Sequence, residues 1–136
     1  MSSLVRPVPA HLDADAELFW AATRDRRLAY QVCDACTSVV FYPRNHCTGC
    51  TSTRLRLSYS MGLGAIYTRT VVRRHTNPFF RQRTPYVVAL VDLDEGFRML
   101  AEVISDRPED VRIGARAAVE WETCGDRNVP LFRVVE

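Results

Sequence analysis

The sequence predicts a mainly β protein that combines an N-terminal helix, a zinc ribbon and a small five-stranded barrel. Three observations lead to this fold class. Residues 14–26 have the apolar spacing of an amphipathic helix. Two C-x-x-C pairs then follow, with ten residues between them. After residue 60, five segments rich in β-forming residues alternate with turn signals.

The chain is long enough for one hydrophobic core. Its 136 residues are 47% hydrophobic and 25% charged, a composition that excludes a disordered, collagen-like or coiled-coil protein. A chain of this length buries roughly two thirds of its unfolded surface, which supports a single core but not two. We expect three parts: an arm and helix at 1–27, the ribbon at 28–60 and the barrel at 61–136.

The predicted helix has a capping residue and one apolar face. Asp13 or Asp15 supplies the side chain that caps the first turn. Leu18, Phe19 and Ala22 follow at near-helical spacing. Two prolines within the first twelve residues indicate that an extended arm precedes the helix.

Four cysteines, Cys33, Cys36, Cys47 and Cys50, have the spacing of a zinc ribbon. Four thiolates fill the tetrahedral shell of one Zn²⁺, with bonds of about 2.3 Å, and leave no position for water, so the metal is expected to be structural. Disulfides are one alternative, which is disfavoured because nothing suggests secretion. A thioredoxin-like redox pair and an iron–sulfur cluster are the others, and the arrangement of the two pairs favours zinc over both. The fifth cysteine, Cys124, is expected to be a free thiol in a turn.

Eight short segments are expected to be strands, three in the ribbon and five in the barrel. Asp94-Glu95-Gly96 marks a tight hairpin turn, and Asn77-Pro78 marks another turn. Five strands after residue 60 fit a small closed or Greek-key barrel. The expected strands are Leu28–Val32, Val39–Tyr42, Leu55–Tyr59, Ala65–Arg73, Tyr86–Leu93, Phe97–Ile104, Ala117–Glu122 and Leu131–Val135.

Positive charge is concentrated in the middle of the chain. Residues 35–91 contain eight arginines and no acidic residue, whereas residues 92–136 contain six arginines and eleven acidic residues. The middle segment is therefore a candidate for binding an anion, although scattered arginines are equally compatible with a solvated surface.

Neither a membrane span nor an export signal is evident. The chain has no run of 18 apolar residues, and its first eleven residues lack the apolar stretch of a signal peptide, so we expect a cytoplasmic protein. The three histidines, His11, His46 and His75, fall in the arm, a knuckle and a loop, where none forms an evident pair with a nucleophile. We therefore expect a protein that is not itself an enzyme.

Short motifs along nearly the whole chain point to a family. They are Phe19-Trp20, Cys33-Asp34-Ala35-Cys36, Tyr42-Pro43-Arg44, Cys47-Thr48-Gly49-Cys50, Gly62-Leu63-Gly64, Pro85-Tyr86, Asp94-Glu95-Gly96 and Val111-Arg112-Ile113-Gly114. In this order they resemble the "domain of unknown function thirty-five" family. The resemblance implies a rubredoxin-like zinc ribbon with one structural Zn²⁺, followed by an OB-fold barrel. The family usually has glycine and proline in its knuckles where this chain has Thr37 and Thr48.

The same resemblance implies a function. Such proteins are non-catalytic accessory subunits that form hetero-oligomers with thiolase-like enzymes, including acyl-CoA thiolases and steroid side-chain aldolases that cleave C–C bonds. They stabilise the enzyme and help to bind the CoA ester. The alternative is a single-stranded nucleic-acid-binding protein, because OB folds and zinc ribbons both bind such strands with basic grooves and aromatic platforms. The rings available for that role are Tyr59, Tyr67, Phe79 and Phe80. The net charge of only +2 disfavours it.

Four arginines on either side of the Asn77-Pro78 turn are candidates for binding the phosphates of CoA. Guanidinium groups pair with phosphates through two parallel hydrogen bonds, which suits this role. An exposed hairpin, or a surface that faces an acidic partner, explains them equally well. The four are Arg73, Arg74, Arg81 and Arg83.

Four aromatic residues are candidates for the partner interface. A small metal-dependent ribbon offers little interior for large rings, and exposed rings in a patch usually mark an interface. Packing into the core is the alternative. The four are Phe19, Trp20, Phe41 and Tyr42.

Overall fold

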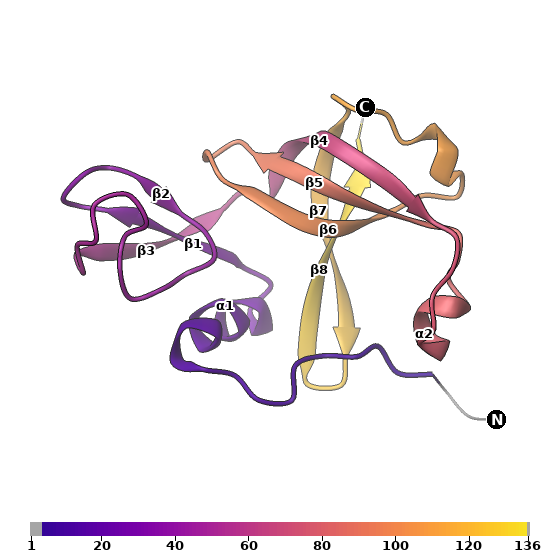
Figure 1. The fold of residues 1–136 in the computed structure, drawn as a ribbon, viewed down its shortest axis with the longest axis horizontal. Helices are drawn as coiled ribbons and strands as arrows, with labels where there is room; N and C mark the ends of the chain where they lie inside the picture. The colour runs from indigo at the N-terminus through magenta and orange to yellow at the C-terminus, as the bar shows by residue number, and fades with distance from the viewer. Residues whose placement is uncertain (1–3, 136) are drawn as a thin grey trace.

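The computed structural model describes residues 4–135, which form a three-stranded ribbon, a closed five-stranded barrel and an N-terminal helix (Figure 1). This arrangement confirms the predicted fold class. No helix in the described part of the chain is long and apolar enough to span a membrane. The elements are α1 (Ala14–Arg24), β1 (Leu28–Cys33), β2 (Val39–Val40), β3 (Leu55–Ser60), β4 (Leu63–Val72), α2 (Pro78–Arg81), β5 (Tyr86–Leu93), β6 (Arg98–Ile104), a 3-10 turn (Pro108–Asp110), β7 (Arg116–Cys124) and β8 (Arg127–Val134).

The ribbon is an antiparallel sheet with β1 in the middle. β1 pairs with β3 along its whole length, from Leu28 to Cys33, but with β2 at only two positions. The ribbon's separate apolar cluster consists of Cys33, Val40 and Cys47, with two partly buried neighbours. A cluster of this size cannot offset the conformational entropy that about thirty residues lose on folding. The ribbon therefore depends on a metal and on packing against the barrel.

The barrel closes in the strand order β4-β5-β6-β8-β7. β5 has the bounds that the sequence predicted, and its residues alternate between the interior and the surface. β6 pairs with β5 along six positions, from Val103 to Arg98. It pairs with β8 at only two, Val103↔Phe132 and Ile104↔Arg133. The first five residues of β6 therefore have no strand partner on the β8 side among the described residues.

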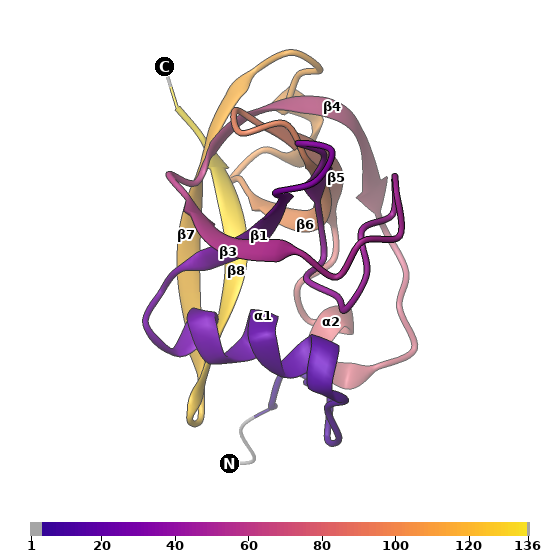
Figure 2. The same ribbon diagram turned by 90° about the vertical axis from the view of Figure 1, so that its left-hand side faces the viewer.

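One hydrophobic core joins the helix, the ribbon and the barrel. Tyr30 of β1 stacks on Phe97 of the barrel with 5.1 Å between the ring centroids, and Phe41 stacks on the same ring at 4.5 Å. Phe19 of α1 and Leu28 of β1 are buried in the same cluster. Both views place α1 beneath the ribbon and beside β8 (Figures 1 and 2). The lower part of the ribbon therefore packs into the same core as the barrel.

Two segments differ from the sequence-based expectations. The Asn77-Pro78 turn begins a short helix, α2, because the Asn77 side chain accepts a hydrogen bond from the Phe79 backbone N–H at 2.9 Å and caps the turn. The last strand begins at Arg127, four residues earlier than expected. Gly125, with a φ of 63°, permits a tight turn in which Cys124 pairs with Arg127.

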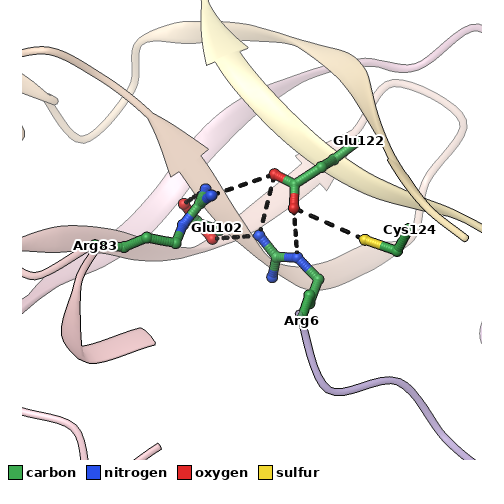
Figure 3. Close-up of polar contacts among 5 residues, drawn as sticks. All are labelled: Arg6, Arg83, Glu102, Glu122 and Cys124. Carbon is green, nitrogen blue, oxygen red and sulfur yellow. Dashed lines mark hydrogen bonds and ion pairs between the residues drawn. The ribbon is translucent and has the colours of Figure 1, made fainter. Parts of the chain in front are cut away.

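An ion-pair cluster of Arg6, Arg83, Glu102 and Glu122 fixes the N-terminal arm to the barrel (Figure 3). Arg6 Nε donates to Glu122 at 2.8 Å, and a terminal nitrogen donates to Glu102 at 3.1 Å. Arg83 contacts the same two carboxylates from the segment after α2. Arg6 also lies over the Phe79 ring, 4.9 Å from its centroid. The arm, α2, β6 and β7 therefore meet at this cluster.

Burial of the cluster costs desolvation free energy, and removal of one of its members leaves a buried charge without a partner. Arg6 and Glu102 are 7% and 9% exposed. Burial by itself lowers the pKa of Arg6, but hydrogen bonds and charges from the two glutamates outweigh it and raise the pKa. Burial likewise raises the pKa of Glu122, yet Arg6 and Arg83 hold it below its usual value of 4.5. The resulting stabilisation is present above the unfolded-state pKa and is lost as pH falls through the folded-state pKa.

We predict that Arg6→Ala lowers the free energy of unfolding by about 3 kcal/mol, because it leaves two carboxylates with one arginine in a poorly solvated site. Urea unfolding at neutral pH measures this loss. Arg133→Ala is the matched control, since Arg133 pairs with Glu120 on the exposed face of β8 and its removal should change stability little. Equal losses in the two variants would contradict the role assigned to the cluster.

Candidate metal centre and surface sites

The two cysteine pairs lie in matching turns. The Thr37 backbone N–H donates to the Cys33 carbonyl at 2.8 Å, and the Thr51 N–H donates to the Cys47 carbonyl at 3.0 Å. Thr37 and Thr51 both have a φ of 66°, a left-handed conformation that favours glycine. Each threonine hydroxyl donates to the carbonyl of the preceding cysteine at 2.5 Å. The knuckles thus keep their shape without the glycine that the family usually has.

The four sulfur atoms of Cys33, Cys36, Cys47 and Cys50 have the geometry of a metal site. All lie within 4.8 Å of one another. The Cys33–Cys50 and Cys36–Cys47 separations are 3.7 and 3.5 Å. A tetrahedron with Zn–S bonds of about 2.3 Å has edges of about 3.8 Å, so the cluster fits one Zn²⁺ with little movement. The Gly49 N–H donates to the Cys47 sulfur at 3.3 Å, as expected for a thiolate ligand.

The low pKa of Cys36 also favours the binding of a cation. The side chain and backbone of Ser38 hydrogen-bond with Cys36 and lower its pKa to about 6. A backbone hydrogen bond from Ser52 lowers the pKa of Cys50, but the other cysteines, Cys36 first, raise it to about 12. Cys36 therefore forms a thiolate readily whereas Cys50 does not, because negative charges on neighbouring sulfur atoms repel each other. A bound Zn²⁺ would hold all four as thiolates and would supply structural stability rather than chemistry.

The four candidate interface rings come together where α1 meets the ribbon, but one of them is not on the surface. The Phe19 and Tyr42 centroids are 5.2 Å apart, and those of Phe41 and Tyr42 are 3.9 Å apart. Phe19 is only 6% exposed and belongs to the core, which corrects its assignment as a surface residue. Tyr42 is 43% exposed, and Trp20 and Phe41 are half-buried. We call Trp20, Phe41 and Tyr42 the aromatic surface.

A groove of about 630 Å³ lies beside the aromatic surface, over the incomplete seam between β6 and β8. Aromatic and aliphatic side chains form most of its walls, with Arg44 and the buried Arg6–Glu102 pair among the few charged groups. The apolar wall consists of Phe19, Trp20, Tyr42, Met99, Leu100 and Leu131. Sequence reasoning missed this groove because it forms between separate segments of the chain, including residues 15–20, 42–44, 99–102 and 129–131.

Three of the four candidate CoA-binding arginines surround a second hollow. Arg73, Arg74 and Arg81 line it together with His75, and its volume is about 620 Å³. Arg81 is held in place by donating to the backbone carbonyls of His75 and Thr76. Arg73 pairs with Glu109 on the exposed surface. We call this site the arginine hollow.

The fourth arginine, Arg83, is not in the hollow, which corrects that part of the expectation. It turns to the other side of α2 and pairs with Glu102 at 2.5 Å and with Glu122 at 3.4 Å. Glu102 lies between the buried residues Ala101 and Val103 of β6, and an acidic residue in such a strand signals that a cation will pair with it. The sequence therefore contained a signal for the cluster, but not the identity of its arginines.

We predict that Cys33→Ser reduces bound zinc from one per chain to well below one and unfolds the ribbon knuckles, because metal binding supplies on the order of 10 kcal/mol to ribbons of this kind. Elemental analysis and thermal unfolding measure the two effects. The barrel should also lose some stability, since Tyr30 of β1 stacks on Phe97. Cys124→Ser, a change to the half-buried cysteine outside the site, should retain full zinc. A zinc-free wild-type protein, or one that binds iron instead, would refute the prediction.

Two domain descriptions match consecutive parts of the chain. Residues 20–56 match the rubredoxin-like zinc ribbon domain of ChsH2, and residues 60–122 match the C-terminal OB-fold domain of ChsH2. These matches confirm the ribbon and the OB-type barrel expected from the motifs.

Two relatives cover most of the chain. A DUF35 domain-containing scaffold protein of Methanocaldococcus jannaschii is 35% identical over 98 residues, which are 70% of this chain and 68% of the relative. A probable enoyl-CoA hydratase alpha subunit of Thermomonospora curvata is 32% identical over 130 residues, which are 95% of this chain. The chain spans only 40% of the length of that second relative.

Solved structures agree with these matches. A chain of the Ltp2-ChsH2(DUF35) aldolase superposes with a TM-score of 0.83 at 30% identity, over 93% of this chain and 98% of that one. A DUF35 protein of unknown function from Sulfolobus solfataricus, 13% identical, shares the fold with a TM-score of 0.66 over 90% of this chain and 86% of that one. The cysteine cluster, the ribbon, the barrel and these relatives together show that the chain belongs to the DUF35 family, with the zinc ribbon and OB-fold domains of ChsH2.

Proposed function

We propose that this protein is a non-catalytic, zinc-stabilised subunit of a hetero-oligomeric complex, in which a thiolase-like enzyme acts on an acyl-CoA by thiolysis or by retro-aldol C–C cleavage. The observation that carries the proposal is the likeness to the Ltp2-ChsH2(DUF35) aldolase, which extends over nearly the full length of both chains. The scaffold proteins among its relatives support a role in holding another enzyme.

The aromatic surface supports the assignment of a partner interface. Trp20, Phe41 and Tyr42 form a cluster of rings on a base that the metal-bound ribbon and the core hold rigid. Rigid, partly exposed tryptophan and tyrosine side chains dominate the binding energy of many interfaces. The Arg127 guanidinium lies 5.5 Å from the Trp20 centroid and helps to fix that ring.

The arginine hollow supports contact with the CoA ester. Its three arginines lie on a concave surface, and the Arg74 side chain has no carboxylate partner among the described residues. A CoA ester carries phosphate groups, which pair well with guanidinium groups held at fixed positions. We therefore assign CoA phosphates to Arg73, Arg74 and Arg81, and we leave Arg83 out.

The nucleic-acid alternative receives less support from the surface. The Tyr67 ring is covered by the Arg98 guanidinium at 3.5 Å, and the Tyr59 ring by Arg27 at 4.8 Å. Phe79 is 9% exposed and lies under Arg6. Bases stack on uncovered ring faces along a continuous basic groove, and an arginine of the chain already covers a face of each of these three rings.

We predict that Trp20→Ala weakens binding to the thiolase-like enzyme by about 2 kcal/mol or more, the effect of removing a central interface residue. Co-purification followed by titration calorimetry measures the change. Tyr42→Ala, at a more exposed ring, should also weaken the complex, whereas Tyr67→Ala on β4, at a ring of similar exposure, is the control that should leave the affinity unchanged. If Trp20→Ala and Tyr42→Ala assemble normally, the interface lies elsewhere.

We predict that Arg74→Glu raises the KM of the complex for a CoA ester about tenfold, because one charge-assisted contact to phosphate is replaced by repulsion. Steady-state kinetics should show kcat and assembly unchanged. An N-acetylcysteamine thioester of the same acyl group has no phosphate, so its KM should be unaffected. Arg112→Glu, an exposed arginine outside the hollow, is the charge-matched control. An equal KM change for both thioesters would contradict phosphate binding at the hollow.

A further inference from the structure

We infer that the groove between β6 and β8 receives an extended segment of the partner enzyme, which pairs with the free edge of β6 as an added strand. This inference rests on the proposed function, because it specifies how the partner of that complex is held. It concerns the backbone of β6, whereas the aromatic surface consists of side chains.

The unpaired backbone of β6 is the first observation. β6 pairs with β5 from Arg98 to Val103, but β8 reaches it only at Val103 and Ile104. Within residues 4–135, no other backbone group hydrogen-bonds to the groove side of Arg98–Glu102. A strand directs alternate N–H and C=O groups to each side, so this five-residue edge offers donors and acceptors along about 14–17 Å. Such an edge is a template for strand addition.

The two edges that border the groove differ in how they are protected. On β8, Pro130 has no N–H to donate, and the Asn128 side chain is engaged with the carbonyls of Thr23 and Arg24 of α1. On β6, the middle residue of the free edge is Leu100, an apolar side chain that is 59% exposed. Proteins usually block a free edge with proline or charge. The β6 edge has no proline, and its two charged residues, Arg98 and Glu102, already form ion pairs within the chain. Because Pro130 interrupts the backbone donors of β8, β6 is the better of the two templates for an added strand.

The walls of the groove suit a polypeptide with apolar side chains. Successive residues of a strand point to opposite faces, so an added strand would place every second side chain against the apolar wall around Trp20, Tyr42 and Leu131. The groove volume of about 630 Å³ is suited to a short extended segment. The Arg6–Glu102 pair at its base is already neutral as a pair, so it demands no charge from the occupant.

Charge at the rim specifies one feature of the occupant. The Gln31 side chain bonds both the N–H and the carbonyl of Arg44, at 2.8 and 2.9 Å, and so fixes that residue at the mouth of the groove. The Arg44 guanidinium donates only to the Tyr42 carbonyl, and in the described part of the chain it has no carboxylate partner. The added segment is therefore expected to have an acidic residue near the Arg44 end, between apolar residues at alternate positions.

Hydrogen exchange of the assembled complex tests the inference directly. We expect the groove-facing amides among residues 98–102, which are every second one, to exchange at least about tenfold more slowly in the complex with the thiolase-like enzyme than in the free chain. The amides between them already pair with β5 and should change little. Residues 86–92 of β5, which are paired in both states, serve as the internal control. A complex that leaves the groove-facing amides of residues 98–102 unprotected overturns the strand addition alone, whereas failure of the wild-type chain to bind any thiolase-like enzyme overturns the proposed function with it.

A matched pair of variants tests whether the partner binds at the free edge of β6. Leu100→Lys places a charge on the free edge and should weaken the complex about tenfold, while the exposed position leaves the melting temperature of the free chain unchanged. Ile113→Lys, at an exposed apolar residue outside the groove, should do neither. Equal affinities for Leu100→Lys and wild type overturn the inference. Protection of residues 98–102 by an acyl-CoA alone, without the enzyme, also overturns it, because the groove would then bind a small molecule.

Discussion

The ion-pair cluster around Arg6 is the interaction on which the surfaces of this protein depend. Charged groups that leave water must pair, and the pairing of Glu102 and Glu122 with two arginines brings the N-terminal arm and the segment after α2 to the same side of the barrel. Both candidate recognition sites border this arrangement. The groove has Arg6 and Glu102 among its lining residues, and the arginine hollow is formed in part by Arg81 of α2, two residues before Arg83.

A second constraint acts on the ribbon, whose own apolar cluster is too small to fold it. The thiolate cluster ties the two knuckles together, and the segment between them is the one that carries Phe41, Tyr42 and Arg44. Gln31 of β1 binds the backbone of Arg44, so the strand that leads into the first knuckle also positions the aromatic surface. In the proposed complex, a structural Zn²⁺ would thus influence recognition without taking part in chemistry, because it would fix the loop that faces the groove.

Local patterns in the sequence predicted what depends on local chemistry. The two C-x-x-C pairs predicted the sulfur cluster. A run rich in β-branched residues that ends at a turn signal predicted β5 with the bounds that the structure has, because such residues favour strands. The helical spacing also allowed for the burial of Phe19, since core packing was one of its two interpretations. The departure of Arg83 from the hollow was not predictable in this way, because Arg83 shares two glutamates with an arginine 77 positions earlier. Composition identifies such residues but cannot assign them to one surface or another.

The distribution of paired arginines separates the two functions that the sequence left open. Of the eight arginines in residues 35–91, Arg56, Arg73 and Arg83 pair with carboxylates. The other five, Arg44, Arg54, Arg69, Arg74 and Arg81, have no such partner within residues 4–135. These five are dispersed: Arg54 is in the ribbon, Arg69 on β4, Arg44 at the groove, and only Arg74 and Arg81 meet, in the hollow. A nucleic-acid strand needs cations in a row at the spacing of its phosphates, whereas a compact phosphate group needs two or three that converge. The arrangement therefore suits a discrete phosphorylated ligand, and the basic middle of the sequence does not become a basic track on the folded surface.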